Sequence, residues 1–116
     1  MLLVEDDEAT RYAWQRYLSQ TGATVKAAET VPEALQMLSV GPVRVLVTDL
    51  MLPGGDGVDL LARARALSPA LLAIAITGFD DEGQRLRALR GGFDAYLAKP
   101  VDPRILVGEI TALIGR

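Results

Sequence analysis

The stretch "VLVTDLMLPGGDG" at residues 45–57 joins a strand pattern, a tight turn and a helix start, and it decides the fold class. The β-branched apolar run Val43–Thr48 predicts a buried strand, and the residue that follows it is a carboxylate, Asp49. The Pro-Gly-Gly sequence predicts a turn, after which Asp56 can cap a helix. Because burying charge is costly, an aspartate at the tip of such a strand needs a chemical explanation.

The same alternation of strand and helix patterns extends outward from this stretch in both directions. Gly and Pro separate the segments, and Thr30, Asp56 and Asp102 stand where helices are expected to begin, with Asp80 or Asp81 in that place for the fourth helix. The expected strands cover residues 1–4, 24–28, 43–48, 71–76 and 94–98. The expected helices cover residues 9–20, 30–39, 56–67, 80–90 and 102–114.

This alternation predicts an α/β fold in one domain, residues 1–116. Strands that alternate with helices favour a parallel sheet covered on both faces. Five such units favour a flavodoxin-like (βα)5 doubly wound sandwich with strand order 2-1-3-4-5. A closed eight-fold barrel needs about 250 residues and is excluded by the length.

Composition excludes several classes of function. With no Cys and no His, the chain has no disulfide, no thiolate or histidine catalysis and no His or Cys metal site. The net charge of −3 argues against nucleic-acid binding through a broad basic face. The longest apolar run, residues 70–76, is far below the ~20 residues that span a bilayer, so we expect no membrane insertion and see no signal peptide.

Polar residues gather at the carboxyl ends of the expected strands. Asp6 and Asp7 follow the first strand, Asp49 ends the third, and Thr77 and Lys99 end the fourth and fifth. In an open parallel sheet these ends meet at the ligand-binding edge. Three close carboxylates repel one another, so either one of them holds a proton at neutral pH or a cation and Lys99 compensate their charge. An all-oxygen site suits Mg²⁺. A carboxylate beside Mg²⁺ and a lysine can attack phosphorus and form an aspartyl-phosphate.

Four stretches in register, "LLVEDDEATR", "VLVTDLMLPGGDG", "AIAITG" and "GGFDAYLAKPVD", resemble the receiver domain of two-component response regulators over essentially the whole chain. The resemblance implies that Asp49 is the phosphoacceptor and that Lys99 pairs with the phosphoryl group. It also implies that Asp7 is a direct Mg²⁺ ligand and Asp6 a ligand through water. Met51 would offer its backbone carbonyl to the metal.

The same resemblance implies a conformational switch. Thr77 corresponds to the switch hydroxyl and Tyr96 to the switch aromatic, and the Lys99–Pro100 peptide bond is expected to be cis. Phe79, two residues beyond Thr77, is expected to slow the attack of water on the phosphoryl group.

The resemblance implies a place in a phosphorelay of bacterial, cytoplasmic signalling. A histidine kinase or histidine phosphotransfer protein would donate the phosphoryl group, since this chain has no His. The face built by the fourth helix, fifth strand and last helix would then change and be read by an unidentified output domain or protein. A homodimer through that face is left open. The domain would assist its own phosphorylation and dephosphorylation without being an enzyme that acts on an external substrate.

Other protein classes that were considered require residues that can be checked in this sequence. A phosphatase of the haloacid-dehalogenase type needs a second acid two residues past the nucleophile, where this chain has Met51. A flavodoxin-like FMN carrier needs a Ser/Thr/Gly-rich loop after the first strand, where this chain has "EDDEA". A receiver that binds partners without phosphate is a further alternative. The chain could also be a stand-alone regulator, a receiver of a longer regulator or a receiver of a hybrid sensor kinase.

Overall fold

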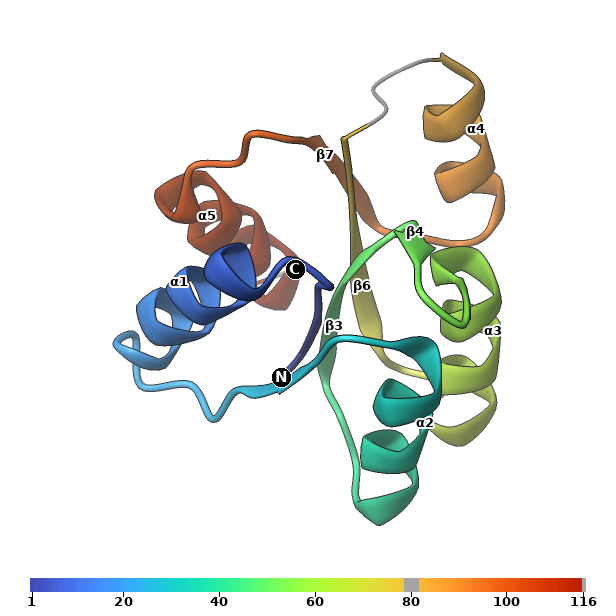
Figure 1. Ribbon diagram of the computed structural model, residues 1–116, viewed down its shortest axis with the longest axis horizontal. Coiled ribbons are helices and arrows are strands. Elements are labelled where there is room, and N and C mark those ends of the chain that lie inside the picture. Colours follow the sequence, from blue (N-terminus) through green and yellow to red (C-terminus); the bar gives the residue numbers. More distant parts are fainter. Residues whose placement is uncertain (79–81, 116) are drawn as a thin grey trace.

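The computed structural model describes residues 1–78 and 82–115, so the expectations for Phe79, Asp80 and Asp81 lie outside the described residues. In this part of the chain a five-stranded parallel sheet has the order β2-β1-β3-β6-β7 (Figure 1). This is the predicted order of the first to fifth strands, which is therefore confirmed. The strands are β1 (Leu2–Val4), β2 (Lys26–Ala28), β3 (Val45–Asp49), β6 (Leu72–Thr77) and β7 (Ala95–Ala98).

Helices cover both faces of this sheet (Figure 1). On one face lie α1 (Glu8–Ser19) and α5 (Pro103–Ile114). On the other lie α2 (Val31–Val40), α3 (Gly57–Leu67) and α4 (Glu82–Arg90). Each face has its own apolar core, and β1 contributes to both: Leu3 packs with α1 and α5, while Leu2 and Val4 pack with α2 and α3. The strands are therefore covered on both sides, as their continuous apolar runs predict.

Helix starts follow the predicted capping residues. The Thr30 hydroxyl accepts a hydrogen bond from Glu33 N at 3.2 Å. Asp56 and Asp102 cap α3 and α5 in the same way. Such caps satisfy backbone N–H groups that have no partner within the helix, so short local patterns set the boundaries well.

A small hairpin follows β3, where the sequence predicts only a turn. Strands β4 (Met51–Leu52) and β5 (Gly55–Asp56) pair antiparallel. The turn between them needs glycine at residue 54, whose φ is +81°, and it rests on the start of α2, where Val31 N donates to Pro53 O at 3.4 Å. The hairpin lies directly after Asp49 and shapes one wall of the site.

None of the helices in the described ranges combines the length and the apolar character that a bilayer-spanning segment needs.

Candidate functional site

The period of two along each strand brings charged residues together at one edge of the sheet. Leu3, Val47 and Leu97 pack on the face that α1 and α5 cover. Two residues further along each strand come Glu5, Asp49 and Lys99, which by alternation belong to the same face. The apolar core of that face thus ends in two acids and a lysine at the carboxyl ends of the strands.

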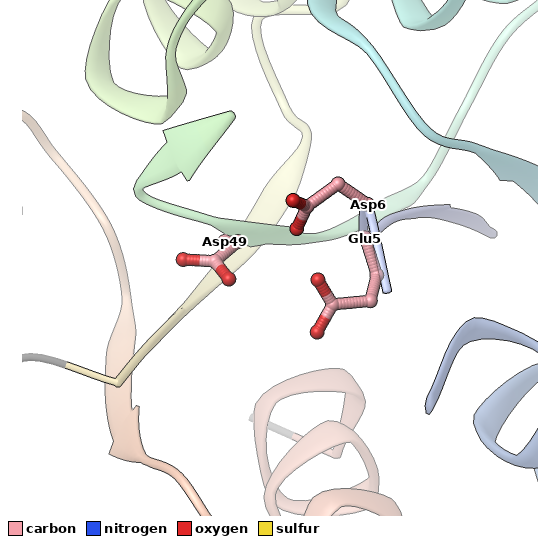
Figure 2. Close-up of side chains that lie close together, drawn as sticks. All are labelled: Glu5, Asp6 and Asp49. Carbon is pink, nitrogen blue, oxygen red and sulfur yellow. The ribbon is translucent and has the colours of Figure 1, made fainter. Parts of the chain in front are cut away.

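The carboxylates of Glu5, Asp6 and Asp49 converge in this place (Figure 2). Among the described residues, one carboxylate oxygen from each lies within 4.8 Å of the other two. Lys99 Nζ lies 2.8 Å from Asp49 Oδ2 and 2.5 Å from Glu5 Oε1. A single ammonium therefore faces three carboxyl groups.

Of the three adjacent acids after β1, Glu5 and Asp6 lie close to Asp49, one position earlier than the pair that the sequence predicts. Asp7, expected as the direct Mg²⁺ ligand, instead caps α1: its Oδ2 accepts hydrogen bonds from Thr10 N at 2.9 Å and Thr10 Oγ1 at 2.6 Å. Glu5 takes the place beside Asp6 because the β1 ladder continues past Val4, with Glu5 N donating to Ala28 O at 3.0 Å. The acids that lie together beside Asp49 are therefore Glu5 and Asp6. Glu5 is the member of this cluster that sequence reasoning missed.

Burial and charge act on these groups in opposite directions. Glu5 is 0% exposed, and burial raises its pKa although Lys99 works to lower it. Burial also works to lower the pKa of Lys99, but its hydrogen bonds to Asp49 and Glu5 outweigh this and the pKa is raised. Hydrogen bonds from Thr10 lower the pKa of Asp7. Lys99 is therefore a fixed positive charge at neutral pH.

Backbone hydrogen bonds fix the position of Asp49. Leu50 N donates to Ile76 O at 3.1 Å and continues the ladder between β3 and β6 beyond Asp49. Met51 N donates to Asp49 Oδ1 at 3.3 Å, while the Met51 side chain is 53% exposed. Asp49 itself is 9% exposed, so its carboxylate is held at the floor of the site and still reaches the surface.

Thr77 and Tyr96 lie on the opposite face of the sheet. Ala73 and Ala75 pack on the side of α2 and α3, so Thr77 continues that face by alternation, and Tyr96 packs against the same core. Thr77 is fully buried and its carbonyl accepts a hydrogen bond from Lys99 N at 2.8 Å. The peptide bond after Lys99, to Pro100, is cis. Thr77 is thus linked to the site through the backbone of Lys99.

The acidic site fits a hard divalent cation. Its donors are oxygens from Glu5, Asp6 and Asp49, and such oxygen sets suit Mg²⁺ or Ca²⁺. A shallow depression lined by Asp6, Met51 and Asp56 opens beside it, and on the other side a groove is lined by Gly78 and Lys99, among other residues. The site can therefore be reached from solvent by a small anion and by a metal ion.

Comparisons with known proteins identify relatives of this chain. Response regulator receiver domains, as a family, match residues 1–111. An uncharacterised 14.6 kDa protein of Leptolyngbya boryana is 41% identical over 109 residues, covering 92% of this chain and 83% of the relative. Response regulator MprA of Mycobacterium ulcerans is 34% identical over 116 residues, covering 100% of this chain and 50% of the relative. The chain therefore spans about half the length of MprA.

Solved structures show the same fold. A CheY-like receiver domain of Methanospirillum hungatei superposes with a TM-score of 0.92 at 32% identity, covering 98% of this chain and 91% of the other. A response regulator of Burkholderia pseudomallei, solved with a phosphorylated aspartic acid and a calcium ion, superposes at 0.85 with 26% identity, covering 96% and 69%. By its sequence match over residues 1–111, this chain belongs to the family of response regulator receiver domains.

Proposed function

We propose that the chain acts as one receiver domain over residues 1–116, in which Asp49 accepts a phosphoryl group. The observation that carries the proposal is the position of Lys99 Nζ, 2.8 Å from Asp49 Oδ2, beside Glu5 and Asp6 at the carboxyl edge of the sheet. An ammonium in this place holds the Asp49 carboxylate by a direct ion pair. The same charge can offset the negative charge of a phosphoryl group that arrives there.

The chemistry is transfer of a phosphoryl group between two nucleophiles. An Asp49 oxygen forms a bond to phosphorus while the bond from phosphorus to the donor breaks, and the electron pair leaves with the donor. A phosphohistidine of a histidine kinase or phosphotransfer protein would be that donor, since this chain has no His. Lys99 then hydrogen-bonds to the new phosphoryl oxygens. The domain is modified by this step and turns over no external substrate.

We assign the metal site to Asp6, Asp49 and the backbone carbonyl of Met51, with Glu5 beside them. Asp6 is exposed and Asp49 nearly buried, so both a solvated and a fixed carboxylate are available. A bound Mg²⁺ would supply positive charge to the phosphoryl oxygens during transfer. The calcium ion in the Burkholderia pseudomallei regulator supports a divalent cation in such a site.

We further propose that Thr77 and Tyr96 transmit the change. Thr77 is joined to Lys99 by a backbone hydrogen bond, and Tyr96 packs on the same face of the sheet as Thr77. Movement of Thr77 toward the phosphoryl group would change the packing of Tyr96 and of the surface formed by α4, β7 and α5. An output domain or protein would read that surface, as a shift in population between two states.

Incubation with acetyl phosphate, followed by intact mass, tests the proposal. We expect a gain of one phosphoryl group that depends on Mg²⁺ and is absent in Asp49→Asn. Asp59→Asn is the matched control, because Asp59 is an exposed aspartate of α3 that pairs with Arg63 away from the site.

A gain that persists in Asp49→Asn would refute the assignment of the phosphoacceptor. If the wild type gains no mass with acetyl phosphate, the binding of beryllofluoride would be measured next. Failure of both would refute the phosphoacceptor function and leave a receiver that binds partners without phosphate.

A further inference from the structure

The side chain of Arg11 joins the acidic loop to the neighbouring strand end. Its Nη1 donates to Glu5 O at 3.0 Å and to Asp6 O at 3.4 Å. The same nitrogen lies 3.6 Å from Glu29 Oε2, in the loop between β2 and α2. The Arg11 side chain is 19% exposed and the Glu29 side chain 58% exposed, so the hydrogen bond to Glu5 O is part-buried while the contact with Glu29 is open to water. Three segments of the chain thus meet on one guanidinium.

These contacts fix the backbone from which two proposed metal-site acids project. Glu5 N is held by Ala28 O at 3.0 Å, and Asp7 is held as the cap of α1. Arg11 ties the carbonyls of Glu5 and Asp6, which lie between those two anchors. The direction of each carboxylate depends on the backbone that carries it, and groups that orient metal ligands affect metal affinity strongly.

We propose that Arg11 is a positioning residue for the metal site: its hydrogen bonds to the Glu5 and Asp6 carbonyls hold the two carboxylates in the arrangement that meets Asp49. The proposal rests on the metal site described under Proposed function. Arg11 acts through the backbone of Glu5 and Asp6, from the side of the loop that faces Glu29.

When Arg11 is replaced, the loss of its charge and the loss of its hydrogen bonds are expected to have opposite effects on Mg²⁺ affinity. A cation close to a metal site repels the metal, so removal of charge alone would strengthen Mg²⁺ binding. Loss of the hydrogen bonds would release the acidic loop and weaken Mg²⁺ binding. The nearby Glu29 carboxylate reduces the net charge that Arg11 presents to the site, and this favours the positioning effect.

A Mg²⁺ titration of thermal unfolding separates these two effects. The stabilisation grows as RT ln(1 + [Mg²⁺]/Kd), so a fit of Tm against Mg²⁺ concentration gives Kd, the concentration that half-fills the site and is called here the concentration at half effect. We expect Arg11→Gln to raise this concentration about tenfold, the lower range for residues that orient metal ligands. Arg11→Lys keeps a positive charge and an N–H donor group that lies one bond nearer to the backbone, and we expect a partial recovery.

Arg16→Gln is the matched control. Arg16 lies on the same helix, is exposed and donates to Tyr12 Oη at 3.2 Å, so the variant removes an equal charge without touching the acidic loop. We expect its Mg²⁺ concentration at half effect to equal that of the wild type.

An equal or lower concentration at half effect in Arg11→Gln would overturn the proposal while the metal site itself stands. A wild type that shows no response to Mg²⁺ would remove the metal site and the role of Arg11 together. Should Arg11→Gln fail to fold, Arg11→Lys decides: an affinity equal to that of the wild type would overturn the proposal, because a lysine ammonium lies one bond nearer to the backbone than Nη1 and cannot keep both hydrogen bonds at their present lengths.

Discussion

Replacement of Gly57 by alanine tests how closely α3 approaches the proposed phosphoacceptor. Gly57 is the first residue of α3, is buried, and donates from its backbone N to Leu50 O at 2.8 Å. A Cβ at this position would lie 2.5 Å from Asp49 O and 2.9 Å from Leu50 Cα, where ordinary contact begins at 3.4 Å. Both atoms belong to the backbone, so they cannot rotate away. The helix start or the end of β3 must move by several tenths of an ångström.

The size of the effect follows from this overlap. Adding a methyl group to a fully packed place costs about 1–3 kcal/mol of unfolding free energy. With an unfolding entropy of roughly 2.1 cal/mol/K per residue, a loss of about 2 kcal/mol in 116 residues lowers Tm by about 8 °C. Since misplacement of reacting groups by about 1 Å can cost ~100-fold in rate, the smaller shift of Asp49 should slow phosphorylation by acetyl phosphate about tenfold.

Urea unfolding and a time course of intact mass measure the two effects separately. Gly108→Ala in α5 is the control, because a Cβ there meets no atom within 4 Å. Its expected result is unchanged phosphorylation and a stability gain of up to about 1 kcal/mol from helix propensity. If Gly57→Ala stays within about 0.5 kcal/mol of the wild type and is phosphorylated at the same rate, the close packing of α3 against β3 is refuted.

Three further measurements test other parts of the structure. Because burial raises the pKa of Glu5, the folded state holds this proton more tightly than the unfolded chain, and metal-free stability should fall as pH rises above the ordinary value of 4.5. Glu5→Gln should flatten that dependence in urea unfolding with EDTA between about pH 5 and 8, and equal slopes would contradict the reasoning. Asp6→Asn should abolish most of the Mg²⁺-dependent rise in Tm while Asp7→Ala keeps it; the reverse result would restore Asp7 to the metal site. Arg65→Gln should lose about 2 kcal/mol in urea unfolding, because its guanidinium bonds Leu71 O just before β6 and Gly92 O and Asp94 in the loop before β7. Exposed Arg63→Gln should change stability by less than about 0.5 kcal/mol, and equal losses in the two variants would refute this.

The elements and their order are predictable because their signals are local. Thr30, Asp56 and Asp102 stand at helix starts, and the strand runs lie between glycines and prolines, so the alternation of units is visible before any contact is known. The strand order was predictable because five βα units favour the flavodoxin-like arrangement of a doubly wound sheet. The prediction was weakest at boundaries, where β1 and β2 are shorter than expected.

The acidic loop shows where sequence reasoning fails. Glu5, Asp6 and Asp7 are adjacent and chemically alike, so their identities do not say which of them reaches the site. The strand period does contain the answer, since Leu3 and Glu5 share a face as Val47 and Asp49 do, but it requires knowing that the ladder continues past Val4.

Contacts between distant segments carry no comparable pattern. Arg11 donates to backbone carbonyls, and any residue type can offer a carbonyl, so nothing in the sequence marks its partners. The β4–β5 hairpin depends on the support of α2, which is equally hidden in the sequence.

Helix α4 contributes fewer buried side chains to the core than the other helices do. Of the side chains in Glu82–Arg90, Ala88 is the one that is buried, while Leu86 and Leu89 are exposed and Arg87 reaches Asp56 at the start of α3. Most substitutions in this helix would therefore leave the free energy of folding almost unchanged. In evolutionary terms, its surface is free to diversify while the sheet edge with Asp49 and Lys99 is not. Under the proposed function, a duplicated copy of this domain could acquire a new partner protein by changes in α4 alone and keep the proposed chemistry at Asp49.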